Sequence, residues 1–368
     1  MTEHRCAPRS LRSLVAWRSL VVHPRTGGFA AFSFLLLALL APSALGAPRG
    51  DTVILNDGGR LDGVEVTRWD FDDVRVRSRA GDKKLTGADI LLVIPGNAPA
   101  DYGRAEASRL SGRWQEAAAL YEKAASLADP VWAKPLGTYY AADCRRLGGE
   151  NGEAVKGFEA FLAAFPKHLF APAAQYGLGE ALLADGKADA ALAVFEKMGR
   201  AYGDRWEFHG KLGKGLCHLA KKSYTAALTE LEIVISNSRG RSGFSELLAR
   251  ASVAKGKSLM DQENFGEAIS FYEGMIRGEG QSAPGAAMAY VNLAKCYERR
   301  SSKEDDKRMA LQTYIAVTVL YPTGEAYPEA LYRAAKLLEE LGDKAKARAF
   351  IDELKARCPQ STQARSVQ

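Results

Sequence analysis

One alanine recurs along most of the chain, and its spacing limits what the chain can fold into. Successive copies lie 37, 37, 36, 41, 42 and 37 residues apart. They are Ala117, Ala154, Ala191, Ala227, Ala268, Ala310 and Ala347. A period of this length is typical of a small unit that is copied and stacked, because one such unit cannot bury its apolar face alone. The pattern therefore predicts a repeat protein rather than one globular core.

Two further positions move in step with this alanine. A small residue precedes it by twelve positions, or by sixteen in the sixth unit, where residues 301–308 lengthen a turn. A large apolar residue follows it by four positions. The small set is Ala105, Ala142, Gly179, Gly215, Gly256, Ala294 and Ala335, and the large set is Tyr121, Phe158, Phe195, Leu231, Tyr272, Tyr314 and Ile351. Small residues let two antiparallel helices approach closely, and the large residue fills the gap to the next unit. We therefore expect seven helix pairs over residues 99–359, followed by a tail at 360–368.

These matched positions resemble the tetratricopeptide repeat family over residues 99–359, most closely at 181–198, 258–275 and 337–354. The resemblance implies a mainly α fold, a solenoid of about seven helix pairs, whose concave groove binds peptides. The family's usual repeat has about 34 residues. The longer units found here are similar to those of exported bacterial envelope proteins that carry such repeats.

Residues 51–96 have a different pattern and predict short strands. Apolar and polar residues alternate around Val53, Val64 and Val74. Residues 57–59 (DGG) and 80–82 (AGD) are turn signals, and residues 90–94 predict a final, more buried strand. Four or five such strands can close as a small barrel or curled sheet. The segment resembles the SH3-like or Sm-like barrels in front of some exported bacterial repeat proteins, and we expect a docking module or a cap on the repeats.

The first 46 residues predict a secretory signal. Five arginines precede an apolar run at residues 29–41, and small residues follow Pro42. We expect cleavage after Gly46 and an exported protein of the bacterial periplasm or cell envelope. The apolar run is shorter than the ~20 residues of a usual spanning helix. If the leader stays uncleaved, residues 29–47 would anchor the chain in the membrane, which is the one condition under which we expect a membrane partner.

The position one past each small residue is expected to face the concave groove. It holds acids in the first three units, Glu106, Asp143 and Glu180, and lysines in the last three, Lys257, Lys295 and Lys336. Three residues before the small position stand Tyr102, Tyr139, Tyr176 and, in the last unit, Tyr332, which Arg333 follows. Tyrosine supplies rigid contact area at low entropic cost, and opposite charges fix the direction of a ligand. These residues predict a peptide groove with an acidic first half and a basic second half.

Other interpretations of this pattern remain open. Charged residues on a helix face are often simply solvated, and opposite ends could instead dock head to tail in a self-assembling envelope protein. The repeat family also has a carboxylate clamp built from lysine and asparagine. Asn292 beside Lys295 is the one place here that is similar to it.

Cysteine placement predicts unpaired core residues. Cys144, Cys217 and Cys296 each lie two residues past the small position of alternate units. Alternate units are separated by roughly twice the ~10 Å helix-packing distance, whereas a disulfide needs Cα atoms within about 7 Å. Cys358, beside Pro359, is expected to be the most exposed thiol.

The residues that mark common catalytic sites are missing from the sequence. It contains no HExxH or CxxC motif, no phosphate-binding loop and no GxSxG elbow. After the leader, 45 basic and 43 acidic residues nearly balance, so a nucleic-acid footprint is missing as well. We expect no metal, no cofactor and no enzyme. The sequence predicts an exported scaffold that binds an unidentified protein or peptide, with self-assembly as the alternative and an enzyme or glycan-binding protein as a remote one.

Overall fold

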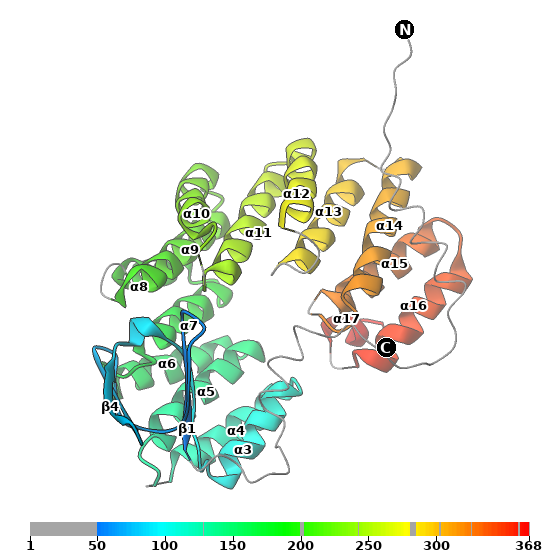
Figure 1. The fold of residues 1–368 in the computed structure, drawn as a ribbon. Coiled ribbons are helices and arrows are strands. Elements are labelled where there is room, and N and C mark those ends of the chain that lie inside the picture. Colours follow the sequence, from blue (N-terminus) through cyan, green and yellow to red (C-terminus); the bar gives the residue numbers. More distant parts are fainter. Residues whose placement is uncertain are drawn as a thin grey trace. The chain divides into compact units, whose positions relative to one another are not determined.

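The computed structural model describes residues 50–127, 129–198, 202–241, 243–279, 285–301, 303–324, 326–359 and 361–367 (Figure 1). The predicted leader at 1–46 and the anchor at 29–47 lie outside these residues. The described chain divides between Ala251 and Ser252 into two compact units. We call residues 50–251 the N-terminal unit and residues 252–367 the C-terminal unit.

The N-terminal unit begins with a five-stranded antiparallel sheet, in the order β4-β3-β2-β1-β5. Its strands are β1 (Asp51–Leu55), β2 (Arg60–Asp70), β3 (Asp73–Ser78), β4 (Gly81–Leu85) and β5 (Ile90–Ile94), with the short 3-10 helix η1 (Gly87–Asp89) before β5. The long strand β2 pairs with β1 through its first half and with β3 through its second half. The register shifts between Val66 and Arg68, so two consecutive segments of β2 serve two different neighbours.

The alternating pattern of the strands builds the core of the sheet. Val64 and Val66 point inward with Val53, while Glu65 between them is exposed. The predicted turns form at glycines with positive φ, Gly58 at 89° and Gly81 at 118°. Strand β5 differs from the expectation of a more buried strand, because it lies at one edge of the sheet order and leaves Leu91 47% exposed.

Antiparallel helix pairs fill the rest of the N-terminal unit. The pairs are α3 (Ala100–Leu110) with α4 (Trp114–Ala125), α5 (Ala133–Leu147) with α6 (Asn151–Ala164), α7 (Ala171–Ala184) with α8 (Ala188–Met198), and α9 (Asp204–Ala220) with α10 (Tyr224–Ser238). A short linker joins β5, which ends at Ile94, to α3, which begins at Ala100. Pro99 directly precedes this helix.

The C-terminal unit continues the same alternation. Its helices are the second part of α11 (Ser245–Asp261), then α12 (Phe265–Glu279), α13 (Ala286–Arg300), α14 (Glu304–Leu320), α15 (Tyr327–Glu340), α16 (Lys344–Arg357) and the short α17 (Thr362–Arg365). Counted with the N-terminal unit, the described chain has the seven predicted pairs. The predicted tail includes α17, whose Ala364 is fully buried in the core of this unit.

The recurring residues pack as the spacing predicted. All seven alanines are buried, none more than 1% exposed. Phe195 shows why the paired positions are small: a Cβ at Gly179 of its own pair would lie 2.5 Å from the phenyl ring, and one at Gly213 of the next pair 2.3 Å. The ring therefore fills the space between two helices that approach it through glycine. In the last unit this role shifts, because Ile351 is partly exposed while Phe350 and Leu354 are buried.

The cysteines follow the prediction for core residues. Cys144, Cys217 and Cys296 are unpaired and fully buried, and Cys358 is unpaired and half-buried. Burial raises the pKa of the Cys217 thiol to about 11 and that of Cys296 to about 12. These thiols therefore behave as small apolar side chains.

Candidate functional site

The tyrosines expected to line the acidic half of a groove are mostly buried, so they do not offer the predicted contact surface. Tyr102 is 4% exposed and Tyr176 is 6% exposed. Tyr102 packs edge-on against Tyr121 of the paired helix, with ring centroids 5.3 Å apart. Tyr139 lies among aromatic rings of α6 and the following loop, and burial raises its pKa. One turn before the small position, the first helix of a pair faces its partner helix, and a large ring there joins the core.

The three carboxylates of that half already have partners. Arg109 donates to Glu106 at 2.8 Å, and Arg146 donates to Asp143 at 2.7 Å. Arg146 also reaches Glu180 at 3.2 Å, and Arg250 pairs with the same carboxylate. The side chains of Asp143 and Glu180 are 19% and 18% exposed. Arginine neutralises this side of the unit, and the expected excess of negative charge is lost.

The basic positions of the C-terminal unit are of two kinds. Lys257 and Lys336 are exposed, and the Lys336 ammonium lies 4.7 Å from the centre of the Tyr332 ring. Lys295 instead pairs with Glu329 at 2.8 Å. The hydrogen bond and charge of Lys336 lower the pKa of Tyr332. Lys257 and Lys336 thus remain available as the basic contacts that the sequence predicts.

The remaining predicted groove residues of this unit take part in internal contacts. Asn292 is 8% exposed, which does not suit the clamp suggested by its place beside Lys295. Arg333 lies 3.2 Å from Glu298 and 3.6 Å from Glu329. The basic half therefore contains two carboxylates that the spacing argument did not include. Binding at these positions stays a prediction.

A second candidate site lies where the sheet meets the repeats inside the N-terminal unit. The Leu169 amide donates to the Trp69 carbonyl at 2.7 Å, and the Phe71 amide donates to the Lys167 carbonyl at 2.8 Å. These bonds join the end of β2 to the loop between α6 and α7. After strand β1, the Asn56 side chain accepts a hydrogen bond from Arg205 of α9 at 2.7 Å. The sheet is therefore docked on the second, third and fourth helix pairs by backbone, polar and apolar contacts.

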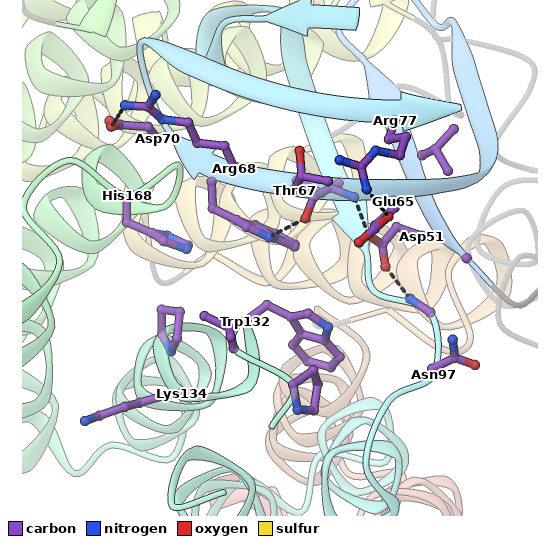
Figure 2. A pocket seen from close by; sticks show the side chains of 18 of the residues that line it. Asp51, Glu65, Thr67, Arg68, Asp70, Arg77, Asn97, Trp132, Lys134 and His168 are labelled. Atoms are coloured by element: carbon purple, nitrogen blue, oxygen red, sulfur yellow. Dashed lines mark hydrogen bonds and ion pairs between the residues drawn. The ribbon is translucent and has the colours of Figure 1, made fainter. Parts of the chain in front are cut away.

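This docking leaves a cleft of about 1530 Å³ between β2 and two inter-helix loops. Figure 2 shows Glu65, Thr67 and Arg68 on the strand side and Trp132 and Lys134 on the helical side. The helical wall consists of residues 129–132, between α4 and α5, of Lys134 and Pro135 at the start of α5, and of residues 165–168, between α6 and α7. Both walls belong to one unit, so the cleft is built by the fold of that unit alone.

The two walls offer aromatic and apolar surface. Val131 is 83% exposed, the largest exposed fraction among the exposed large apolar residues of the described chain. Trp132 is held in place because its ring packs edge-on against Tyr102, with centroids 5.1 Å apart. The Trp69 indole donates to the Val66 carbonyl at 3.1 Å. Rigid rings around an open cleft are typical of a binding surface.

His168 adds one unused hydrogen-bond donor to the cleft. Its ring stacks against Trp69 with centroids 5.9 Å apart, and its Nδ1 accepts a hydrogen bond from the Phe170 amide at 3.1 Å. The proton of the neutral ring is therefore on Nε2, which is buried and has no hydrogen-bond partner among the described residues. Burial lowers the pKa of His168 to about 4, with the nearby Asp70 carboxylate opposing the shift.

Only weak signals for this cleft are present in the sequence. Residues 127–132 (LADPVW) place three large apolar residues in a break between helical segments, where polar residues are usual. The sequence could not show that this break faces strand β2, because residues about 65 positions apart become neighbours only through the docking of the sheet.

Comparison with known families agrees with the repeat architecture. Two family models, each described as a tetratricopeptide repeat, match residues 146–205 and 329–361. These two segments of the chain are tetratricopeptide repeats. The first match spans parts of α5 and α9 with the α6–α8 segment between them, and the second covers most of α15 and all of α16. No curated protein has a sequence that matches this chain.

Several solved structures are similar to this chain at low sequence identity. A repeat protein from Parabacteroides merdae is 12% identical with a TM-score of 0.48, covering 73% of this chain and 95% of its own. NprR in complex with its cognate peptide NprX is 13% identical with a TM-score of 0.45, covering 72% and 80%. YrrB, described as having an unusual peptide-binding site, is 18% identical with a TM-score of 0.32, covering 57% and 98%.

Two further properties of the described part of the chain bear on function. Its His, Cys, Asp and Glu side chains form no group of three or more that could hold a metal ion. None of its helices combines the length and apolar character needed to cross a membrane.

Proposed function

We propose that the protein is an exported interaction scaffold that holds a segment of a partner protein in the cleft between its sheet and its first repeats. The observation that carries this proposal is the cleft itself, with its volume of about 1530 Å³ and its aromatic walls. Pockets for small ligands usually have about 300–1000 Å³. The larger and more open cleft suits a length of polypeptide better than a small molecule.

Export is part of the proposal and rests on the first 46 residues. Cleavage after Gly46 leaves a chain that begins at Ala47, three residues before the described structure starts. We expect this product in the envelope fraction of a bacterial host. The intact mass of the purified protein shows whether cleavage follows Gly46. A chain that retains residues 29–47 in a membrane fraction would replace export by anchoring.

The experiment for the binding surface is photo-crosslinking from a single position. A benzoyl-phenylalanine at Val131 places the reactive group in the cleft, and the same residue at Val319 gives a matched control that is 41% exposed but lies in the C-terminal unit. We expect a discrete crosslinked protein from position 131 and none from position 319. Mass spectrometry identifies it, and titration calorimetry then measures its binding, once purified, to the wild-type chain.

The Val131→Asp variant separates a partner in the cleft from an accidental crosslink. Val131 is so exposed that the change should leave the fold intact, while a carboxylate replaces the apolar contact. The purified partner should bind this variant more weakly than the wild type. Equal affinities, or crosslinking from position 319 alone, would refute the cleft as the binding surface.

Head-to-tail self-assembly remains the competing proposal from the sequence. The carboxylates that would form its acidic end are paired with Arg109, Arg146 and Arg250. Sedimentation at several salt and protein concentrations measures it directly. Mass that rises with concentration and falls with salt would favour self-assembly.

A further inference from the structure

We propose that the cleft is selective for an extended peptide segment in which acidic side chains are interspersed with apolar ones. This inference rests on the proposed function, because it assumes that the cleft is the binding surface. It adds the chemistry of the occupant, which follows from three features of the walls: how the strand backbone is used, which charges lack partners, and where apolar surface is left exposed.

The backbone of the strand wall is already in use. Residues 65–70 of β2 pair with β3. In the same segment, the Val66 amide donates to the Asp51 carboxylate, and the Trp69 carbonyl accepts from the Leu169 amide. Few backbone groups of these residues are therefore left to pair with a bound segment. Its contacts on this side are mainly to the outward side chains of β2, which include Glu65 and Thr67. Side-chain recognition makes the composition of the occupant decisive.

The charges in the cleft do not balance once internal pairs are set aside. Glu65 lies 3.3 Å from Arg77, and Arg68 lies 3.2 Å from Asp70. The Asp51 carboxylate accepts from the backbone amides of Val66 and Gly96 at 2.7 and 2.8 Å. These lining groups have their charges satisfied inside the unit.

Three cations that line the cleft have no ion-pair partner in the described chain. They are Arg79, Lys134 and Lys167, all exposed, and the one lining carboxylate in the same condition is Asp129. Lys134 and Lys167 belong to the helical wall, and Arg79 follows β3 on the side of the sheet. Unpaired positive charge on both sides favours an occupant with several carboxylates.

The apolar surface of the helical wall is the reason that the occupant needs apolar side chains as well as acidic ones. Val131 and Trp132 lie between Pro130 and Pro135 on the helical wall, and a proline nitrogen has no hydrogen to donate. Two residues of this stretch therefore offer no backbone donor, and the exposed Val131 presents carbon to the cleft. Apolar side chains of the occupant would cover it and remove it from water. Intervening acidic side chains would meet the lysines that flank the stretch.

His168 supplies a polar contact that a peptide backbone can use. Its neutral ring carries a hydrogen on Nε2 with no partner in the described chain, at the edge of the cleft. A buried donor without an acceptor is costly, and a peptide carbonyl or carboxylate at hydrogen-bond distance would relieve that cost. The ring cannot turn away easily, since it is stacked between Trp69 and Phe170.

The test is a selection from a random twelve-residue peptide library displayed on phage, using the full chain as bait. We expect selected peptides to be enriched in Asp and Glu separated by apolar residues. One selected peptide, made with a fluorescent label, is then titrated against the variants. Its affinity should fall roughly tenfold in Lys134→Glu/Lys167→Glu, since each exposed ion pair contributes a few-fold. Raising the salt concentration should also weaken it.

A matched control keeps the number of reversed charges constant. Lys123 on α4 and Lys197 on α8 are exposed, lie outside the cleft and have no ion pair in the described chain. Lys123→Glu/Lys197→Glu should bind the peptide like the wild type. Equal weakening in the two double variants would show a general charge effect and would overturn the inference.

The outcomes also separate this inference from the proposed function. Selected peptides that are neutral or basic, and whose binding is lost in Val131→Asp, would keep the cleft as a binding surface but overturn the acidic occupant. If the wild type enriches no peptide above the Val131→Asp/Lys134→Glu/Lys167→Glu variant, both proposals are wrong.

Discussion

Helix pairs of the two units can use the same repeat in different ways. In the third and fourth pairs, which belong to the N-terminal unit, helices approach one another through glycine, as Gly179 and Gly213 do around Phe195. In the C-terminal unit the corresponding small residues of the last two pairs are alanines, Ala294 and Ala335, and the large residue of the sixth pair is Tyr314. The Tyr314 hydroxyl donates to Glu298 at 2.8 Å. The third pair thus relies on close aromatic packing, and the sixth pair adds a polar anchor to a similar core, as Tyr121 does with Glu106 in the first pair.

The units also differ in what is attached to the repeats. The N-terminal unit carries the sheet and contains three histidines and four tryptophans. Among them, Trp69 and His168 stack where the sheet meets the repeats. Residues 252–368 contain neither histidine nor tryptophan. A solenoid alone supplies rather uniform helix faces, whereas a sheet docked on its loops creates a cleft with two unlike walls. This difference teaches that the added module, not the repeat, makes the most distinctive site.

The largest expected difference between the units is their response to mild acid. Burial lowers the pKa of both His168 and His209 to about 4, from about 6.5 in an unfolded chain. The unfolded chain therefore takes up protons first as the pH falls. The N-terminal unit keeps its full stability above pH 6.5 and loses it between pH 6.5 and 4, by up to about 3 kcal/mol for each histidine.

Tryptophan fluorescence during urea unfolding measures this loss, because Trp69, Trp114, Trp132 and Trp206 all belong to the N-terminal unit. Far-UV circular dichroism reports both units. In the C-terminal unit, the hydrogen bond from Arg300 lowers the pKa of Asp306. The stability that this pair contributes therefore persists until the pH falls below about 4. A fluorescence midpoint that does not move between pH 7 and 4 would contradict the prediction.

Removing the ring between two glycines should have the next largest effect. Phe195→Ala leaves a cavity bounded by α7 and α9, which cannot collapse easily, and should cost the N-terminal unit about 3–5 kcal/mol. The midpoint of the fluorescence transition should fall accordingly. The matched change in the C-terminal unit, Tyr314→Phe, keeps the ring and removes one hydrogen bond, for about 1 kcal/mol. Similar losses in both variants would argue against the packing difference.

A single methyl group should act with opposite sign at a packed glycine of the N-terminal unit and at an open glycine of the C-terminal unit. Gly213→Ala places a Cβ 2.3 Å from the Phe195 ring, and such overpacking costs about 1–3 kcal/mol. Gly274→Ala on α12 meets no atom within 4 Å, and alanine favours a helix over glycine by about 0.5–1 kcal/mol. Thermal unfolding of both variants checks the pair. Stabilisation by Gly213→Ala would show that the phenyl ring has room to move.

The fold was largely predictable because repetition reveals which residues share an environment. Any one alanine in a helix is uninformative, but Ala117 and its six equivalents all proved to be buried. The last unit was the exception. There the apolar position shifts from Ile351 to Phe350 and Leu354, since no further pair follows to be packed against.

The groove was less predictable, because sequence spacing shows which face a residue is on but not what reaches it from other helices. Glu180 was expected to be an open carboxylate, yet Arg146 from the preceding pair and Arg250 from α11 both contact it. Tyr102 was expected to be a contact surface, but the neighbouring helix covers it. The cleft depends on docking between distant segments, and no local pattern encodes that.

The smallest expected effect on stability separates the groove from the cleft. Lys257 and Lys336 are exposed, so Lys257→Glu/Lys336→Glu should change the free energy of unfolding by no more than about 0.5 kcal/mol. Lys295 is left unchanged, since a glutamate there would face Glu329. If the partner lies in the cleft, this variant should bind it like the wild type, whereas Lys134→Glu/Lys167→Glu should bind it more weakly. Calorimetric titration of all three chains with the crosslinked partner gives the answer. A loss confined to Lys257→Glu/Lys336→Glu would return the binding site to the groove of the C-terminal unit, where the sequence placed its basic half.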